Sequence, residues 1–556
     1  MFRIFVLVVL LLEILPAQSP KLLDVMSEEL ERNFKALKEK GDPPPYYLAY
    51  AVSEQESSGA TASLGALVAS SRRHWRTLDI TIRVGNPKLD NYHPVRGESA
   101  QFTRGASISI EDSPDAIKRT LWHETDRCYR LAAERLINIK TNKEVKVAEK
   151  EQSDDFSEAP SPQAVQQPAK QDFDLGDWEK RVRKLSAMLA NRPDLIGSSA
   201  SAMGSSEVKY FVSSDGGRLM HGRPSARVML TSSSKAEDGM DLSTFDSFDA
   251  FSARKLPKDS ELKEAFEKLG RDAEALRVAP LVDAFVGPAI LSGRAAGVFF
   301  HEIFGHRVEG HRLKDETDGQ TFAKSVGARV LPEFLSVVFD PTLKNAAGQD
   351  LNGWFQFDDE GVAARKVTVV EQGILKTFLM SRTPIPNLPS SNGHGRRQAG
   401  NEVVARQSNL LVEATKTVNE KRLREMLIEE VKRQNKPYGY YFQEITGGFT
   451  NTGRRGIQAF KVIPLVVYRI HVDGREELVR GADIVGTPLA SFAKIIAAGD
   501  KLEVFNGYCG AESGNVPVSA IAPAILVSEL EIQKKESSRE RPPLLPAPTA
   551  TNGGGL

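Results

Sequence analysis

The 556-residue sequence is poor in cysteine, has no excess of either charge, and has no long apolar run after its first twenty residues. Cys128 and Cys509 are the two cysteines, and one pair is no disulfide framework even if the two were joined. Lysine plus arginine and aspartate plus glutamate both number 73, so the net charge gives no broad electrostatic reason to expect nucleic acid or an anionic membrane as partner. No segment beyond the N-terminus is apolar enough to span a membrane, and no repeat of fixed period is found.

A short basic start and an apolar run from Ile4 to Leu12 mark the N-terminus, with Ala17 as a small residue for cleavage. This pattern predicts a secretory signal peptide over residues 1–19. We therefore expect an exported protein, periplasmic or secreted, with no stable membrane insertion once the signal is removed. Glu13 interrupts the apolar region, so an uncleaved amphipathic or anchoring N-terminus is the alternative.

The pattern of apolar residues predicts an α+β fold. Helical spacing predicts a helix over 22–40, and alternation at period two predicts strands between 46 and 84. Short strands and turn signals dominate from residue 279 onward. Further helices are expected over about 113–139, 178–189 and 261–278.

The length predicts two domains with appendages. We expect a mixed α/β N-terminal domain over 20–285, with a flexible, proline-bearing insertion at about 148–170. A largely antiparallel-β C-terminal domain over 286–535 would carry a metal-binding helix. The composition of residues 536–556 is that of a disordered tail.

Three of the nine histidines, His301, His306 and His311, fall within eleven residues after a small and apolar segment. A buried imidazole needs partners for its nitrogens, and one divalent metal satisfies several imidazoles at once. Glu302 stands beside the first histidine, where a zinc peptidase has the general base that takes a proton from metal-activated water. The alternative by spacing alone is a set of packing or surface histidines with an unrelated glutamate.

The spacing of His301 and His306 differs from that of the common HExxH motif. Residues five apart lie about 140° around a regular helix, so the two cannot bind one ion from an undistorted helix. Either the helix carries a π-type turn, or it ends near Gly305 and His306 folds back; glycine permits both. We favour a local π-bulge.

A catalytic zinc requires a third protein ligand. Glu309 and His311 are the candidates close by, and Cys509, within Asn506-Gly507-Tyr508-Cys509-Gly510, is the distant one. The alternatives for Cys509 are a free buried thiol or a disulfide with Cys128.

The residues around the histidines resemble a known family. The segment from His301 to Gly310 resembles the HExxxH segment of the TldD/PmbA metallopeptidases, also called modulators of DNA gyrase. The resemblance extends over about Pro288 to Glu531. Within that range further motifs follow in the family's order: Phe357-Asp358-Asp359-Glu360-Gly361, Asn392-Gly393-His394-Gly395-Arg396-Arg397, Gly447-Gly448-Phe449-Thr450, Val479-Arg480-Gly481-Ala482 and Gly507-Tyr508-Cys509-Gly510.

The resemblance implies a chain of the catalytic, TldD-like branch, which binds zinc through His301, His306 and Cys509 and uses Glu302 as general base. It implies hydrolysis of unfolded peptides or small proteins, which bind as an added β-strand. It also implies a homodimer, or a heterodimer with a PmbA-like subunit. The export-type N-terminus departs from the family, whose well-known members are cytoplasmic, and argues against a gyrase-related role.

Arg396, Arg397 and His311 complete the candidate site as substrate-binding residues. Either arginine could pair with a peptide carboxylate, and His311 leaves a spare imidazole near the metal motif; simply solvated side chains are the alternative. The rival function is a non-catalytic peptide-binding or assembly subunit with a structural metal site. Such a site has four protein ligands, so a fourth ligand from His311 or Glu309 would favour this rival.

Overall fold

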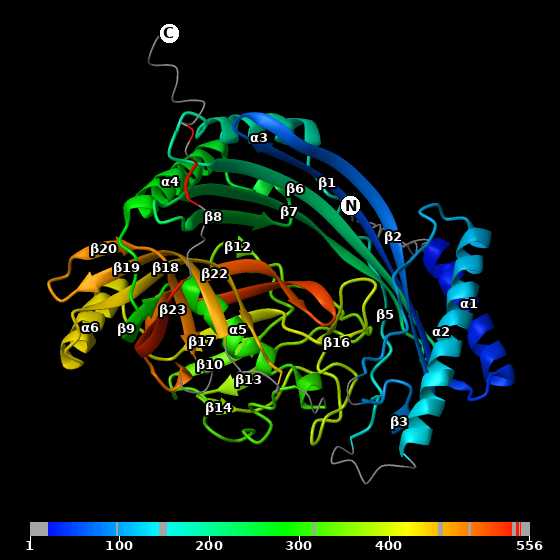
Figure 1. Ribbon diagram of the computed structural model, residues 1–556. Coiled ribbons are helices and arrows are strands. Elements are labelled where there is room, and N and C mark those ends of the chain that lie inside the picture. The colour runs from blue at the N-terminus through cyan, green and yellow to red at the C-terminus, as the bar shows by residue number, and fades with distance from the viewer. Residues whose placement is uncertain are drawn as a thin grey trace, which may run out of the picture.

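The computed structural model describes residues 21–95, 98–143, 153–314, 318–453, 460–486, 491–535, 541–543 and 545. The predicted signal peptide and most of the predicted tail lie outside these residues. Within them, no helix is long and apolar enough to cross a membrane. The described residues form two large sheets with helices packed on them, so the predicted α+β class is confirmed (Figure 1).

An eight-stranded sheet forms the N-terminal part of the fold, in the order β3-β2-β1-β6-β7-β5, with β4 beside β2 and β8 beside β7. Its long strands pair antiparallel: β1 (Pro45–Ser63), β2 (Ala66–Asn86), β6 (Gly197–Ser213) and β7 (Arg218–Lys235). Its shorter strands are β3 (Leu89–Asp90), β4 (Ala106–Ser107), β5 (Gln163–Val165) and β8 (Asp241–Ala250). The long strands are apolar towards their ends and polar in the middle, where β1 reads Ser53-Glu54-Gln55-Glu56-Ser57-Ser58-Gly59.

Two pairs of helices cover the apolar ends of these strands, and all four lie where the sequence predicted helices. α1 (Lys21–Lys40) and α2 (Pro114–Lys143) share one core with β1 and β2, because their apolar residues recur at helical spacing. α3 (Leu175–Ala187) and α4 (Asp259–Val278) share a second core with the opposite ends of the strands. The polar middle of the sheet lies between the two helix pairs and arches over the C-terminal domain (Figure 1).

An eleven-stranded sheet forms the C-terminal domain, in the order β14-β13-β10-β17-β23-β21-β19-β18-β9, with β20 beside β19 and β22 beside β23. β9 also pairs with β23, so five of the strands close a ring. Most pairs are antiparallel, as predicted; β17 with β23 and β9 with β18 are parallel. The strands are β9 (Phe285–Leu291), β10 (Leu335–Phe339), β13 (Val367–Glu371), β14 (Ile374–Leu375), β17 (Asn409–Ala414), β18 (Tyr438–Thr450), β19 (Phe460–His471), β20 (Glu476–Val479), β21 (Ala482–Gly486), β22 (Ile495–Ala511) and β23 (Gly514–Lys534).

Two helices and two small hairpins complete this domain. α5 (Gly293–Ile303) is buried in its core against β18, β22 and β23. α6 (Glu420–Arg433), which was not predicted, packs on residues of β9 and β23 that point away from that core. The hairpins pair β11 (Asn345–Ala346) with β12 (Gln349–Asp350), and β15 (Gly395–Arg396) with β16 (Val404–Ala405).

The stretch predicted as a flexible insertion, about 148–170, differs from that expectation in its described part, 153–170. Asp155 and Phe156 are buried. The ring of Phe156 lies 4.0 Å from the guanidinium carbons of both Arg83 and Arg382, one from each domain. β5 then adds to the N-terminal sheet parallel to β7. The acidic, proline-bearing composition indicated a linker, but its few apolar and charged side chains have specific partners in both domains.

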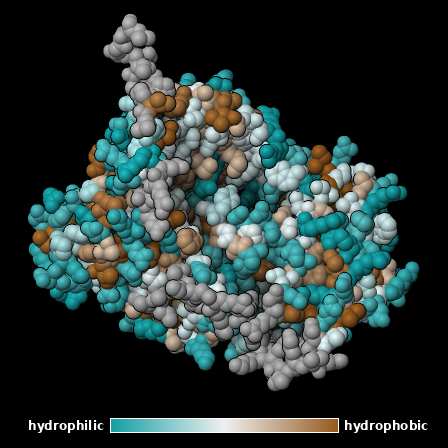
Figure 2. Space-filling view, in the orientation of Figure 1, coloured by the Kyte–Doolittle hydropathy of each residue, from teal (hydrophilic) through white to brown (hydrophobic). Residues whose placement is uncertain are grey.

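A cavity of about 390 Å³ lies between the polar middle of the N-terminal sheet and the loops of the C-terminal domain. Residues of β1, β6 and β7 line one side of it, and residues around 354–359, 396–399 and 508–517 line the other. Figure 2 shows that the viewed face of the molecule mixes hydrophilic and hydrophobic residues and is hollowed near its centre, where the residues are hydrophilic.

Candidate metal centre

The helix that carries the histidine motif, α5, is fixed at its start by Ser292. The Oγ of Ser292 accepts a hydrogen bond from the Ala295 N–H at 3.1 Å and donates one to the Gln443 carbonyl at 2.9 Å. The first turns of the helix are small, and a Cβ at Gly297 would lie 3.1 Å from the carbonyl oxygen of Ala520 in β23. The sequence therefore holds the C-terminal end of α5, with the histidine motif, at a fixed place in the core.

The helix ends at Ile303, and Gly305–Arg307 form a 3₁₀ turn. The predicted π-bulge is therefore wrong, and the other alternative, a helix that ends before His306, is the one found. Arg307 explains how the ending is stabilised: its Nη1 donates to the carbonyls of Glu302 and Ile303 at 3.1 and 3.0 Å, in the last turn of the helix. The tighter turn carries the His306 imidazole to the same side as His301.

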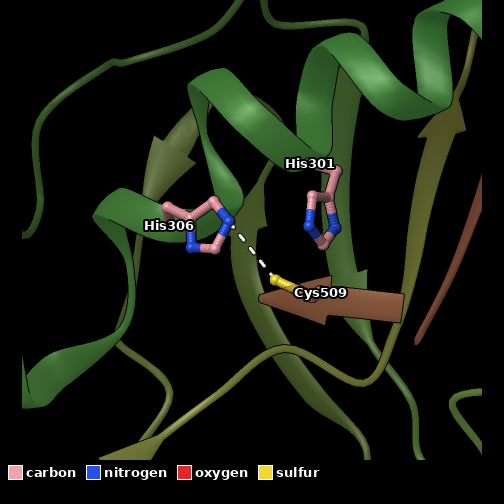
Figure 3. A group of neighbouring side chains, drawn as sticks. All are labelled: His301, His306 and Cys509. Atoms are coloured by element: carbon pink, nitrogen blue, oxygen red, sulfur yellow. Dashed lines mark hydrogen bonds between the residues drawn. The ribbon is translucent and has the colours of Figure 1, made fainter. Parts of the chain in front are cut away.

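His301, His306 and Cys509 meet at this point, although the cysteine is some 200 residues away in the sequence (Figure 3). Each side chain offers one ligand atom, and the three atoms all lie within 4.8 Å of one another. Cys509 Sγ is 3.3 Å from His306 Nε2, and the two imidazole rings are nearly perpendicular with centroids 5.1 Å apart. All three side chains are buried. Cys128, in contrast, is a residue of α2 and lies in the core that this helix shares with α1 and the N-terminal sheet, and both cysteines are free thiols.

Glu309 lies outside this group of donors and binds the other ring nitrogen of His306, Nδ1. Its Oε2 accepts a hydrogen bond from His306 Nδ1 at 3.1 Å and another from Arg312 Nη2 at 2.8 Å, while its Oε1 lies 3.4 Å from Arg406 Nε. Burial alone would raise the pKa of Glu309, but the charges of His306, Arg312 and Arg406 hold that pKa well below its usual range. A carboxylate on Nδ1 leaves Nε2 directed at the donors, which is how metal-binding histidines are oriented in proteins.

The charges within the cluster suit a metal site. Burial alone would raise the pKa of the Cys509 thiol, but the adjacent His306 and His301 lower that pKa well below its usual range. Burial alone would lower the pKa of His306, yet Cys509 and Glu309 raise it well above its usual range. A thiolate beside two imidazoles, one of them backed by a carboxylate, is a donor set that zinc prefers. The residues present therefore fit the implied metal.

Glu302 lies at the border between the donors and β18. Its Oε2 is 3.9 Å from His306 Nε2, and burial raises the pKa of its carboxyl group against the opposing effect of the two histidines. A Cβ at Gly448 of β18 would come within 2.8 Å of Glu302 Cγ and 2.9 Å of the Lys461 carbonyl oxygen. Glycine at position 448 thus leaves the space that the Glu302 side chain occupies.

The other three candidate residues lie outside the group of donors. His311 Nε2 pairs with Glu512 Oε1. Arg396 and Arg397 both line the cavity between the domains, and Arg397 Nε lies 3.9 Å from Asp79 Oδ2 of the N-terminal sheet. Arg397 therefore lies near a carboxylate of the N-terminal sheet, and His311 pairs with a glutamate.

Two buried residues that support the site were missed in the sequence, Arg406 and Gln407. Arg406 donates from Nη2 to the Cys509 carbonyl at 2.6 Å and from Nη1 to Ser513 Oγ at 2.8 Å. Gln407 Nε2 donates to the His301 carbonyl at 3.2 Å. Their partners lie about a hundred residues away, so the one available signal was a polar pair directly after a very short apolar strand.

Comparison with known proteins finds relatives of the C-terminal half of the chain. Residues 286–534 match the family model described as the PmbA/TldA metallopeptidase C-terminal domain. A metalloprotease of Methanocaldococcus jannaschii is 29% identical over 262 residues, which cover 47% of this chain and 53% of that protein. A protein of Saccharolobus solfataricus named zinc metalloprotease TldD homolog is 25% identical over 248 residues, 44% of this chain and 51% of that protein. The chain thus spans about half the length of the curated relatives it matches.

The solved structure of TldE from Thermococcus kodakarensis resembles the whole fold, with a TM-score of 0.61 at 14% identity, and the alignment covers 92% of this chain and 100% of that one. At this identity the likeness shows the fold alone. Fold and family model together define a two-domain protein with a C-terminal domain of metallopeptidase type. Residues 286–534 are thus similar to the C-terminal domain of the TldD/PmbA family.

Proposed function

We propose that this chain is a zinc-dependent peptidase of the catalytic, TldD-like kind, which hydrolyses unfolded peptides or small proteins. The observation that carries the proposal is the meeting of His301, His306 and Cys509 at the end of α5, with Glu302 beside them. Relatives named metalloprotease and zinc metalloprotease support the general class.

His301, His306 and Cys509 would hold the zinc, and Glu309 would keep the His306 ring in position through Nδ1. When bound, zinc would supply a Lewis acid for the scissile carbonyl and the attacking water. The mixture of one thiolate with two imidazoles favours zinc over harder divalent ions.

Glu302 is the proposed general base. Its carboxylate would accept a proton from the attacking water and return it to the leaving amine. Its position supports this role, because its side chain lies beside the donors and packs against Gly448 of β18.

β18 supports an extended peptide as substrate. Its residues Glu444–Thr450 pair with β19 along one edge, whereas β9 reaches only Tyr440–Phe442 on the other. No strand among the described residues pairs with the remaining edge. Backbone hydrogen bonds to a free edge bind a peptide largely regardless of its sequence, and this edge passes Glu302 at Gly448.

The alternative is a structural metal site in a non-catalytic peptide-binding or assembly subunit, which would need a fourth protein ligand. Among the residues described by the structure, the donor group contains three members. Both nearby candidates for a fourth place have other partners: Glu309 binds His306 and Arg312, and His311 binds Glu512. This arrangement favours the catalytic proposal.

Metal content and activity together test the proposal. We expect one equivalent of zinc by elemental analysis, lost in His306→Ala and Cys509→Ala but kept in the control Cys128→Ala. Glu302→Gln should retain the zinc and lose peptidase activity on an unfolded protein by about a hundredfold to ten-thousandfold. Undiminished activity in Glu302→Gln would contradict the mechanism, and full zinc content in Cys509→Ala would contradict the site.

We further propose a dimer, formed with a second copy or with a PmbA-like subunit, and export after removal of residues 1–19. Likeness to a TldE fold supports a related partner, and the N-terminal sequence alone supports export. Light scattering of the purified chain, with and without such a subunit, would measure the assembly, and N-terminal sequencing of the exported protein would locate the cleavage. The division of the chain near residue 285 stays a prediction.

A further inference from the structure

The cavity between the two domains has no role in the proposed chemistry so far. Its floor is the polar middle of β1, β6 and β7, and aromatic side chains of Trp354, Phe355 and Tyr508 stand on the opposite wall. Four cationic side chains also line it: Lys209, Arg223, Arg396 and Arg397. A recess of this size lined by cations and aromatic rings is suited to an anionic group attached to a larger ligand.

Two of the four cations already have carboxylate partners. Lys209 Nζ lies 2.6 Å from Asp359 Oδ1. Arg397 Nε lies 3.9 Å from Asp79, and the Arg397 N–H donates to Asp359 at 2.8 Å. These two residues therefore contribute little unpaired positive charge to the cavity.

Arg223 and Arg396 differ, because neither forms an ion pair with any carboxylate of the described residues. Each uses Nη1 on a backbone carbonyl, Arg223 on that of Asn352 at 2.5 Å and Arg396 on that of Gln407 at 2.6 Å. In the described part of the chain, the Nε–Nη2 edge of each guanidinium has no acceptor. That edge binds a carboxylate side-on through two parallel hydrogen bonds.

The two guanidinium groups line the same cavity and repel each other. Burial lowers the pKa of both, to about 10 for Arg396, and the charge of Arg223 adds to the lowering at Arg396. Two like charges that line one recess repel each other, and an anion between them would relieve the repulsion.

Carboxylates lie near these two guanidinium groups and raise their pKa values, Asp359 for Arg396 and Glu207 and Asp249 for Arg223, but among the described residues none forms an ion pair with either. Asp359 is paired with Lys209, and Glu56 lies beside His74 at 3.9 Å. Glu207 stands opposite Arg223 in the β6–β7 register and accepts a hydrogen bond from the Gln55 amide at 3.4 Å, without forming an ion pair with Arg223.

The cavity adjoins the candidate metal centre. The Gln407 carbonyl accepts from Arg396, and the Gln407 side chain donates to the His301 carbonyl at 3.2 Å. Tyr508 lines the cavity while its neighbour Cys509 joins the donors, since successive side chains of a strand point to opposite faces.

We propose that Arg223 and Arg396 together bind a carboxylate of the peptide substrate close to the scissile bond, so that the enzyme prefers peptides with an acidic group there. The inference rests on the proposed function in taking the ligand to be a peptide. The carboxylate belongs either to the C-terminus of the peptide or to an aspartate or glutamate side chain, and the two sources share one chemistry.

Binding of fluorescent peptides, followed by anisotropy, tests this without turnover. One peptide free of acidic side chains is compared with its C-terminal amide, and the amide carrying one glutamate is compared with the same amide carrying glutamine. We expect the wild-type protein to bind the acidic member of at least one pair about tenfold to a hundredfold more tightly. The pair that shows the difference identifies the source of the carboxylate.

Arg396→Gln and Arg223→Gln should bring the two members of that pair to nearly equal affinity, because each variant removes a hydrogen-bonding edge that only the acidic member uses. The exposed Arg254, which is not among the residues that line the cavity, gives the control Arg254→Gln, which should keep the preference. Arg396→Lys and Arg223→Lys serve if the glutamine variants unfold on heating earlier than the wild type; they should keep the fold and lose most of the preference, because lysine lacks the two-pronged edge.

Equal binding of both members of each pair by the wild-type protein would overturn the inference, as would an unchanged preference in Arg396→Gln. A protein that prefers acidic peptides but cleaves none would contradict the proposed peptidase function and support the carboxylate pocket. Cleavage of peptides without any acidic preference would support the peptidase function and contradict the carboxylate pocket, so the two failures are distinguishable.

Discussion

The His306 side chain is fixed at both ring nitrogens, by Glu309 at Nδ1 and towards Cys509 at Nε2. Because the carboxylate orients the ring and increases its basicity as a ligand, we expect Glu309→Gln to weaken zinc binding by about tenfold to a hundredfold. Competition with a chromophoric chelator measures the affinity. The exposed Glu413→Gln is the control, and an affinity equal to that of the wild type would show that Glu309 only fills space.

Gly448 offers a second prediction for a single residue. A Cβ there would press on Glu302 Cγ and on the backbone of β19, so Gly448→Ala should displace the carboxylate. We expect kcat to fall about tenfold or more while the zinc content is kept. Gly176→Ala in α3, where a Cβ meets ordinary contacts, is the matched control; normal turnover in Gly448→Ala would show that Glu302 needs no such space.

Sequence reasoning at this scale found the residues that carry distinctive chemistry and missed those that support them. His301, His306 and Cys509 stand out because two spaced histidines and a cysteine between glycines are uncommon combinations. Arg406 and Gln407 look like ordinary polar residues, and their role depends on carbonyl groups that only the fold brings near. The contrast between Arg396 and Arg397 likewise depends on whether a carboxylate from the other domain reaches them.

Among the elements, α5 links stability to the metal site through its first residue. Ser292 both caps the helix and binds the Gln443 carbonyl next to β18. We expect Ser292→Ala to lower the free energy of unfolding by about 1 kcal/mol in a denaturant titration and also to weaken zinc binding, since the cap fixes the helix that holds His301. Asn419→Ala, which removes the corresponding cap of α6, should lower stability similarly and leave zinc affinity unchanged. Equal zinc affinity in the two variants would show that the N-cap of α5 does not influence zinc binding.

The elements also show where periodicity stops being informative. The five-residue spacing of the histidines revealed that a regular helix was impossible, but both a π-bulge and an early ending satisfied it. The outcome depends on Arg307, which binds the final carbonyls of α5 from the following turn. α6, in contrast, carries Leu423, Leu427 and Val431 at helical spacing and was predictable.

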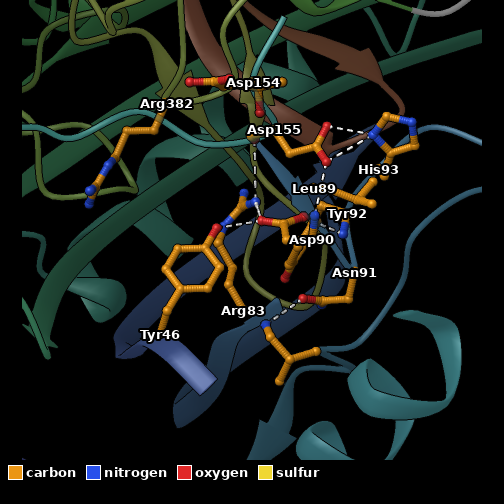
Figure 4. Close-up of polar contacts among 12 residues, drawn as sticks. Tyr46, Arg83, Leu89, Asp90, Asn91, Tyr92, His93, Asp154, Asp155 and Arg382 are labelled. Atoms are coloured by element: carbon orange, nitrogen blue, oxygen red, sulfur yellow. Dashed lines mark hydrogen bonds and ion pairs between the residues drawn. The ribbon is translucent and has the colours of Figure 1, made fainter. Parts of the chain in front are cut away.

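At the scale of the whole molecule, a buried polar network joins the domains at residues 153–157 (Figure 4). Asp155 binds His93 at 2.9 Å and Lys314 at 3.2 Å, and Arg83 binds Asp90 at 2.6 Å close by. Composition could not reveal this network, because each partner belongs to a different segment of the sequence. The same holds for the cavity, whose walls come from strands and loops more than a hundred residues apart.

This network predicts a dependence of stability on pH. Burial alone would raise the pKa of Asp155, but the hydrogen bond with His93 and the charge of Lys314 lower it below its usual range. A carboxyl with a lowered pKa stabilises the folded state fully above its unfolded pKa of about 4, and this stabilisation is lost as the pH falls further. Asp155→Asn should therefore lower the free energy of unfolding by about 3 kcal/mol at pH 7, and by progressively less below about pH 4.

Urea titrations between pH 7 and pH 3 measure this difference. The exposed pair of Asp126 with Arg130 provides the control Asp126→Asn, which should change stability little at any pH. If the difference in the free energy of unfolding between Asp155→Asn and the wild type stays constant down to pH 3, the charge of Asp155 does not contribute to stability.

The alternation of side chains along β22 has a consequence for how this protein can diversify. Tyr508 and Cys509 face different compartments, and the pairing of Cys509 with Val516 decides which residue faces which. A slip by one position would exchange phenol and thiol, so the register of one hairpin protects the chemistry of both compartments. Substitutions at every second position of the strand can alter what the cavity accepts and leave the donors untouched. The residues that select the substrate and those that bind the metal thus lie on the same strand, but each set can be substituted without changing the other.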